Sequence, residues 1–208
     1  ILQRQWTRDD YSTITNTYPD HEDIQGPAGI NIPQVMTHFI PQKGILVTSE
    51  EEMTPILTHA SMKKSTDIHY SGWLELGLLT PDVLDRFPYE EHPANVALVL
   101  KLCEILEIDP NFAVREMADR VVPDIGALKV YPTASIASRR LEFINGMSAN
   151  ERFAALGNWQ RMGFDAHNHD AQPGIMLSTI VNNRADRIPR SRTFASILVN
   201  DFNADRHF

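Results

Sequence analysis

The feature of this sequence that most constrains its fold is a continuous apolar run. Residues 44–49 read GILVTS and follow a Lys-Gly turn, which is typical of a strand buried on both faces of a parallel sheet. Segments 11–17 and 66–70, rich in Thr, Ile and Tyr, are two further strand candidates. Between the strands expected at 44–49 and 66–70, Ser49 followed by three acidic residues predicts a helix that starts at a hydroxyl cap. This order predicts a βαβ unit and a parallel sheet.

Downstream of that unit the pattern becomes helical. Apolar residues recur at helical spacing over 93–108. Asp109-Pro110 is typical of a cap followed by the first turn of a second helix, which we expect to end at about 122. The stretch 123–140 contains Pro, Gly and only a short strand pattern, so it is the best candidate for a joint between two α/β pieces.

Beyond the joint, strands and helices alternate again. We expect strands at 141–146 and 174–181, and helices at 149–162 and 191–202. The predicted fold class is therefore α/β: a parallel Rossmann-like sheet followed by part of a second Rossmann-like α/β domain. Ligands of such folds bind beyond the carboxyl ends of the strands, so site residues are expected there.

Composition excludes several classes of protein. The chain has 208 residues, with 19 Lys+Arg against 27 Asp+Glu and a net charge of −8, which argues against a general binder of nucleic acid or anionic membrane. The single cysteine, Cys103, excludes an internal disulfide framework and a Cys-based zinc site. No apolar run approaches the roughly 20 residues that a membrane-spanning helix needs.

A first polar cluster follows the strand at 11–17. Asp20, His21 and Asp23 lie just beyond its end, and carboxylate and imidazole groups can hold a divalent ion such as Mg²⁺. On spacing alone, a polar turn with side-chain caps is the simpler explanation of these residues.

A second cluster, Arg184, Asp186 and Arg187, follows the strand at 174–181. Guanidinium groups at a strand end suit an anionic ligand, because they form forked hydrogen bonds. A solvated helix start, with Asp186 pairing an arginine, explains the same residues equally well.

Other motifs are weak or missing. The tract HNHD at 167–170 resembles a metal-binding tract, but a solvated loop explains it better. Neither a G-x-x-x-x-G-K-[ST] phosphate loop nor a G-x-S-x-G elbow occurs in the sequence.

Five segments, in colinear order, together resemble one protein family. The first reads NTYPDHEDIQGP and the last NNRADR, and the five are 16–27, 92–98, 123–129, 143–151 and 182–187. They are similar to the Mur-ligase superfamily, and within it most similar to the ATP-dependent ligase subunits of poly-γ-glutamate synthases, which act in capsule synthesis. The resemblance covers nearly the whole chain.

The resemblance implies an ATP-dependent, ADP-forming amide ligase. Such enzymes phosphorylate a substrate carboxylate, and an amine then attacks the acyl phosphate to give an amide. In the capsule subgroup glutamate, or a poly-γ-glutamate chain, is joined through the γ-carboxylate. ATP and Mg²⁺ are the implied cofactors, because cations must neutralise the phosphates during transfer. The implied setting is the cytoplasmic side of the cell membrane, with other subunits of a membrane-associated complex and a possible homo-oligomer.

Position by position, the resemblance also implies roles for residues. His21 matches a Mg²⁺ ligand, with Asp20 and Asp23 beside it, and Asn95 matches an asparagine that reads adenine. Lys129 matches a residue that faces the phosphates of the nucleotide, and Asn150 and Glu151 match residues near its ribose. A role at a phosphate or at a substrate carboxylate is implied for Arg184, Asp186 and Arg187.

The sequence departs from the family pattern in three respects. Lys129 stands where the family has an arginine, so the charge is kept but the bidentate hydrogen bonding of a guanidinium is lost. Glu151 stands where the family has an aspartate. The family's phosphate-binding loop is missing. We therefore expect an internal fragment, inactive alone, with 1–122 as the second half of the central ATP-binding domain, 123–140 as the joint, and 141–208 as the first part of the C-terminal ligase domain.

Two other functions remain open at the level of sequence. One is a non-catalytic, Mur-ligase-like binding or scaffold module that lacks the phosphate loop. The other is an unrelated metal-dependent hydrolase that uses Asp20, His21 and Asp23.

Overall fold

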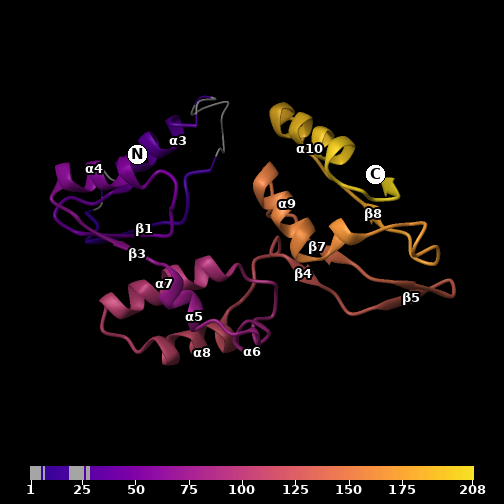
Figure 1. The fold of residues 1–208 in the computed structure, drawn as a ribbon, viewed down its shortest axis with the longest axis horizontal. Coiled ribbons are helices and arrows are strands. Elements are labelled where there is room, and N and C mark those ends of the chain that lie inside the picture. Colours follow the sequence, from indigo (N-terminus) through magenta and orange to yellow (C-terminus); the bar gives the residue numbers. More distant parts are fainter. Residues whose placement is uncertain (1–5, 7, 19–25, 27–28) are drawn as a thin grey trace. The chain divides into compact units, whose positions relative to one another are not determined.

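The computed structural model describes Trp6 and residues 8–18, 26 and 29–208, and it divides into two compact units (Figure 1). The first unit is Ile1–Asp124 and the second is Ile125–Phe208.

The first unit contains the predicted parallel sheet. Strands β1 (Tyr11–Ile14), β2 (Ile45–Thr48) and β3 (Asp67–Tyr70) are parallel, in the order β1-β2-β3. The apolar run forms the central strand, and Leu46 is completely buried because both edges and both faces of β2 are covered. Helix α4 (Thr54–Lys64) connects β2 to β3, so the βαβ prediction is confirmed.

The predicted start of that helix is wrong. Ser49 does not cap it: its hydroxyl donates to the carbonyl of Thr15, and α4 begins later, at Thr54, where Pro55 occupies the first turn. The acid at position 50 is turned inward instead, and its carboxylate accepts the backbone N–H groups of Glu52 and Met53. A tight turn therefore separates β2 from α4.

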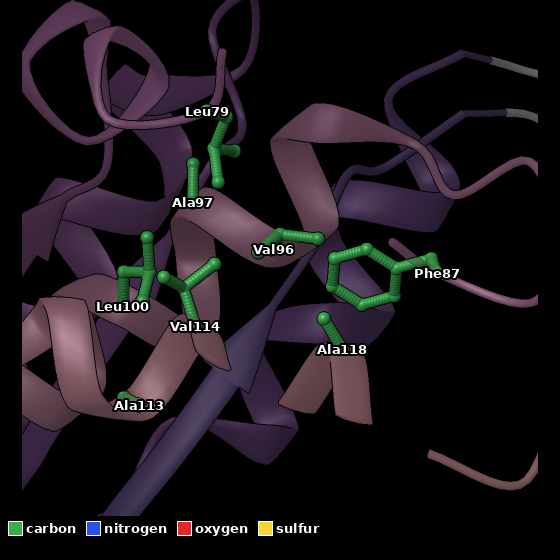
Figure 2. Packing of buried hydrophobic residues seen from close by; sticks show 8 residues of the cluster. All are labelled: Leu79, Phe87, Val96, Ala97, Leu100, Ala113, Val114 and Ala118. Carbon is green, nitrogen blue, oxygen red and sulfur yellow. The ribbon is translucent and has the colours of Figure 1, made fainter. Parts of the chain in front are cut away.

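Helices make up the rest of the first unit and enclose a second core. Eight buried side chains point toward one another there, as Figure 2 shows: Leu79, Phe87, Val96, Ala97, Leu100, Ala113, Val114 and Ala118. The two predicted helices are confirmed as α7 and α8, and Asp109 caps α8 by accepting from the Phe112 amide at 2.7 Å. The elements are α3 (Asn31–Met36), the 3₁₀ helix η1 (Thr37–Phe39), α5 (Trp73–Gly77), α6 (Pro81–Leu84), α7 (Pro93–Ile105) and α8 (Pro110–Arg120).

The second unit has α/β character, but its strands are shorter than predicted. The pairs are β4–β7 and β5–β6, both antiparallel, and β8–β9, which is parallel. The elements are β4 (Lys129–Val130), β5 (Ala134–Ile136), β6 (Arg139–Leu141), β7 (Ile144–Asn145), α9 (Arg152–Arg161), η2 (Phe164–Ala166), β8 (Ser178–Thr179), α10 (Ile188–Asn200) and β9 (Arg206–His207).

A hairpin explains why the strand expected at 141–146 is divided. Ala137 and Ser138 both have positive φ, 49° and 62°, and turn the chain between β5 and β6. Such a turn matches the twist of two antiparallel strands. Residues up to Leu141 therefore pair with β5, and only Ile144–Asn145 remain to pair with β4.

An aromatic stack forms the centre of the second unit. The Trp159 ring of α9 stacks on Phe202 at a centroid distance of 4.0 Å and contacts Phe164 at 5.0 Å. Trp159 is 7% exposed and Ile197 of α10 is completely buried. The ring contacts join α9, η2 and the segment just after α10.

All described helices are short. The longest of them, α7 and α10, have 13 residues each. None in the described part of the chain is long and apolar enough to cross a membrane.

Candidate functional site

The predicted metal ligands Asp20, His21 and Asp23 lie outside the described residues. The structure does describe the chain that leads to them from β1. Thr17 is buried there, and its backbone amide donates to the carboxylate of Glu50 at 2.6 Å. The segment that carries the candidate ligands therefore starts from a fixed point at the carboxyl end of the sheet.

Glu50 holds the chain at Thr17 in place through its carboxylate. It is only 3% exposed, and its two oxygens accept three backbone N–H groups, those of Thr17, Glu52 and Met53. Burial pushes the pKa of Glu50 upward, but the hydrogen bonds from Met53, Thr17 and Glu52 outweigh it and hold the pKa below its usual value. The sequence pattern predicts a helix start for this acid, whereas its position directly after a buried strand is the signal of its structural role.

Asn95 lies where the sequence places it, in the first turn of α7. Its side chain is exposed, and its amide Nδ2 donates to Glu91 at 3.3 Å. His92 caps the helix by accepting from the Ala94 amide at 3.3 Å. The Asn95 amide thus has a defined orientation and an accessible edge.

Three further predicted residues lie at one end of the β4–β7 pair. Lys129 pairs with Asn145 across the two strands, and its ammonium lies 5.5 Å from the centre of the Tyr131 ring. The loop after β7 leads to Asn150 and Glu151, and the Ser148 amide ties this loop back to Gly126. The structure therefore brings Lys129 together with the loop that carries the other two.

Glu151 has a structural task in this loop. Its carboxylate caps α9 by accepting the backbone N–H groups of Phe153, at 2.7 Å, and Ala154. Asn150, directly before it, is exposed. A ligand that uses Glu151 would meet a carboxylate already held in place by the helix.

The arginine cluster begins beyond β8. Arg184 and Asp186 form a forked pair, with Nε to Oδ1 at 3.0 Å and Nη2 to Oδ2 at 2.7 Å. Arg184 holds the pKa of Asp186 below its ordinary value. Arg187 precedes the first turn of α10. The pairing agrees with the alternative of a solvated helix start, and the exposed guanidinium of Arg184 remains accessible to an anion.

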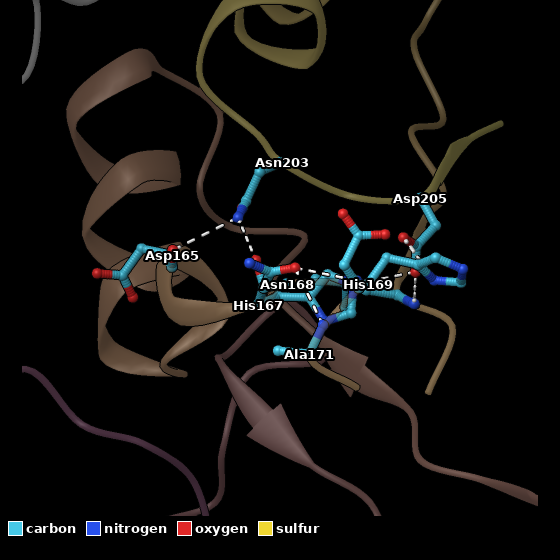
Figure 3. Close-up of polar contacts among 9 residues, drawn as sticks. Asp165, His167, Asn168, His169, Ala171, Asn203 and Asp205 are labelled. Carbon is cyan, nitrogen blue, oxygen red and sulfur yellow. Dashed lines mark hydrogen bonds and ion pairs between the residues drawn. The ribbon is translucent and has the colours of Figure 1, made fainter. Parts of the chain in front are cut away.

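The tract at 167–170 is a loop with Asn168, His169 and Asp170 exposed, as the sequence predicts, but the side chain of its first histidine is buried. The side chain of His167 is 6% exposed and its Nε2 lies 3.0 Å from Asp205 Oδ2, as Figure 3 shows. Asp205 also accepts from the Leu177 amide at 2.7 Å, and His169 lies 3.4 Å from its other oxygen. In the described part of the chain, no three His, Cys, Asp or Glu side chains are grouped to hold a metal ion.

Asp205 therefore joins the loop at 167–170 to the start of β8. The Leu177 amide and the two histidines hold the pKa of Asp205 below its ordinary value. A carboxyl of this kind stabilises the fold above its unfolded pKa of about 3.9, and the contribution is lost as pH falls through the lower folded pKa.

We expect Asp205→Asn to lower the midpoint of thermal unfolding at pH 7, and to lower it much less near pH 3. The exposed Asp170 of the same loop offers a matched control, since Asp170→Asn should leave the midpoint unchanged. Calorimetry at the two pH values measures both effects. An equal loss for Asp205→Asn at both pH values would contradict the role of the carboxylate.

Comparisons with known proteins bear directly on these segments. Residues 130–208 match the family described as the poly-gamma-glutamate synthase CapB C-terminal domain. The chain is 30% identical over 196 residues to PGA synthase CapB of Bacillus subtilis (strain 168), covering 94% of this chain and 47% of that protein. The predicted resemblance is confirmed. The chain is also 29% identical to the capsule biosynthesis protein CapB of Bacillus anthracis, covering 94% of this chain and 40% of the relative. It thus spans less than half the length of these relatives.

Solved structures show the same fold. E. coli FolC in complex with ADP matches with a TM-score of 0.58 at 14% identity, covering 95% of this chain and 58% of FolC. A point mutant of L. casei FPGS matches with a TM-score of 0.55 at 10% identity, covering 97% of this chain and 58% of FPGS. The likeness shows a common fold, and the predicted α/β fold class is confirmed.

Proposed function

We propose that this chain is part of an ATP-dependent, ADP-forming ligase that makes γ-glutamyl amide bonds in poly-γ-glutamate capsule synthesis. The observation that carries the proposal is the similarity to two CapB proteins along 94% of the chain. The domain match over residues 130–208 supports it independently of the first unit. We assign 1–122 to the central ATP-binding domain, 123–140 to the joint and 141–208 to the C-terminal ligase domain.

The described residues offer groups that fit a nucleotide. Asn95 presents an exposed amide, which can both donate to and accept from an adenine edge. Lys129 supplies a cation for the phosphates, and the neighbouring loop supplies Asn150 and Glu151 for the ribose.

The carboxylates of Asp20 and Asp23 suit Mg²⁺, which takes oxygen ligands and keeps several waters, and His21 is proposed as a further ligand beside them. When bound, the ion offsets the negative charge of the phosphates. Glu50 accepts the Thr17 amide and so fixes the described chain just before this segment.

Arg184 is proposed to bind the acidic substrate or a phosphate, and Asp186 and Arg187 to support it. The forked pair with Asp186 fixes the plane of the guanidinium while leaving it exposed. The planar guanidinium of an arginine can donate two parallel hydrogen bonds to a carboxylate, which the ammonium of a lysine cannot.

In the intact protein, Arg184→Ala should lower kcat/KM for glutamate by about tenfold or more, because a charge-assisted contact to the substrate is lost. Stability should hardly change, because exposed ion pairs contribute little. Arg140→Ala removes an exposed arginine from another pair, Arg140–Glu142, and is the matched control. Unchanged kinetics for Arg184→Ala would contradict the binding role and favour the alternative that this cluster is only a solvated helix start.

The proposed partners are glutamate or a poly-γ-glutamate chain, further subunits of a synthase complex at the cytoplasmic face of the membrane, and a second copy of this protein. No nucleic-acid partner is proposed, in line with the net charge of −8. The relatives named PGA synthase and capsule biosynthesis protein support the first of these.

Trapping with hydroxylamine tests the reaction. The intact protein, given ATP, Mg²⁺, glutamate and hydroxylamine, should form γ-glutamyl hydroxamate and ADP in equal amounts. Nucleotide binding without any hydroxamate or ADP would favour a non-catalytic module. Metal-dependent ester hydrolysis without ATP would favour a hydrolase.

A further inference from the structure

A chain of hydrogen bonds surrounds the start of α7. Glu91 Oε1 accepts from the His92 amide at 2.7 Å and from Asn95 Nδ2 at 3.3 Å. The hydroxyl of Tyr89 donates to the other oxygen, Oε2, at 2.5 Å. Both oxygens of this partly buried carboxylate are therefore engaged, and one of them holds the side chain of Asn95.

The carboxylate itself is well fixed. Burial, together with Glu91, raises the pKa of Tyr89, so its hydroxyl remains a donor throughout the physiological range. The Tyr89 ring packs edge-on against Phe87 at a centroid distance of 6.1 Å, and Phe87 belongs to the helical core of the first unit. Glu91 is thus connected through Tyr89 to a rigid part of the fold.

A carboxylate can only accept hydrogen bonds, so it determines which way the Asn95 amide faces. The NH₂ group must point toward Glu91, and Oδ1 must point away from it. Oδ1 of this exposed residue has no partner among the residues that the structure describes. Asn95 therefore presents an acceptor, with the second N–H of the amide beside it.

That orientation matches one type of purine. A 6-aminopurine donates from its exocyclic amine and accepts at N7, which is the pattern that an asparagine recognises with two hydrogen bonds. A 6-oxopurine would place its carbonyl oxygen against Oδ1, and two acceptors repel. We propose that Glu91 is a positioning residue that locks the Asn95 amide and so makes the nucleotide site select adenine over 6-oxopurines. This inference rests on the proposed function, in which Asn95 contacts the base.

The test compares ATP with ITP, whose base differs from adenine in carrying a 6-oxo group and a proton at N1. In the intact protein we expect kcat/KM to favour ATP by about tenfold or more, the range that one bidentate amide–base pair supplies. Glu91→Gln should reduce that preference by about tenfold, because a glutamine can donate to Oδ1 and let the amide turn over. The change should appear mainly in KM, with kcat at saturating ATP retained.

Two further variants complete the comparison. Glu91→Ala removes the acceptor altogether and should also lose the preference for ATP. It therefore tests the proposal even if Glu91→Gln does not fold. Glu90→Gln removes the same charge from an exposed neighbour and should leave the preference intact. Thermal unfolding of each variant separates misfolding from a change of selectivity.

The outcomes are distinguishable from failure of the proposed function. If the wild type turns over neither nucleotide, the ligase proposal fails. If Asn95→Ala abolishes the preference for ATP but a folded Glu91→Gln keeps it, only the role of Glu91 is overturned. Equal losses with ATP and ITP in Glu91→Gln would also overturn it, since a merely structural residue would act in that way.

Discussion

His21→Ala in the intact protein should lower turnover by about two orders of magnitude, the scale on which loss of a transition-state charge contact acts. The reason is the proposed role of this imidazole as a Mg²⁺ ligand beside Asp20 and Asp23. A polar residue beyond the end of β1 contributes little to a core, so the melting temperature should change little. The assay is ADP release at saturating ATP and glutamate, with Mg²⁺ varied.

The chain offers a control for that substitution. His59 is an exposed histidine on α4 of the same unit, and His59→Ala should leave turnover unchanged. Excess Mg²⁺ should recover part of the His21→Ala activity, because two carboxylates of the proposed set remain. Full activity of a folded His21→Ala protein at limiting Mg²⁺ would contradict the metal role.

Glu50→Ala should lower the free energy of unfolding by about 3 kcal/mol. It leaves three backbone N–H groups, of Thr17, Glu52 and Met53, without the acceptor they now have, and each orphaned donor that is buried costs about 1–3 kcal/mol. Equilibrium unfolding in urea measures the change. Glu51 is exposed, and Glu51→Ala should alter stability by less than about 0.5 kcal/mol.

The Glu50 effect should also depend on pH. Its carboxyl has a folded pKa below the unfolded value of about 4.3, so its contribution is complete above pH 5 and is lost as pH falls through the folded pKa. The difference between wild type and Glu50→Gln should therefore shrink below pH 4. A difference that stays constant from pH 7 to pH 3 would show that the ionised carboxylate is not what the three amides require.

Much of the first unit follows from local patterns. The GILVTS run predicts a buried parallel strand because both faces of such a strand are covered, and β2 indeed pairs with a strand on each side. Asp109-Pro110 predicts the start of α8 because a carboxylate and a proline suit its first turn, and the structure shows that cap. Both features are signalled by residues that lie within a few positions of one another in the sequence.

The misses depend on longer-range contacts or unusual turns. Ala137 and Ser138 adopt positive φ without a glycine or asparagine to signal it, so the β5–β6 hairpin was not predicted. Glu50 turns inward because the Thr17 amide, 33 residues away, needs an acceptor. His167 is buried because Asp205, 38 residues away, pairs with it. No local spacing encodes these pairings.

The candidate site shows the same division. Asn95 and Lys129 can be located from motif order, and the structure places both on ordered elements. The second role of Glu151, as the cap of α9, and the contact of Glu91 with Asn95 become visible only in three dimensions. An acid four residues before an asparagine on a helix start is too common a pattern to single out Glu91.

Transfer of isotopic oxygen tests the proposed reaction most directly. The intact protein should be incubated with ATP, Mg²⁺ and glutamate labelled with ¹⁸O in the γ-carboxylate, and the released phosphate analysed by mass spectrometry. Because the γ-carboxylate attacks the terminal phosphorus and leaves an oxygen behind, each amide formed should yield ADP and one phosphate that carries a single ¹⁸O. Amide formation with unlabelled phosphate, or with the label in AMP, would contradict an ADP-forming ligase that acts through an acyl phosphate.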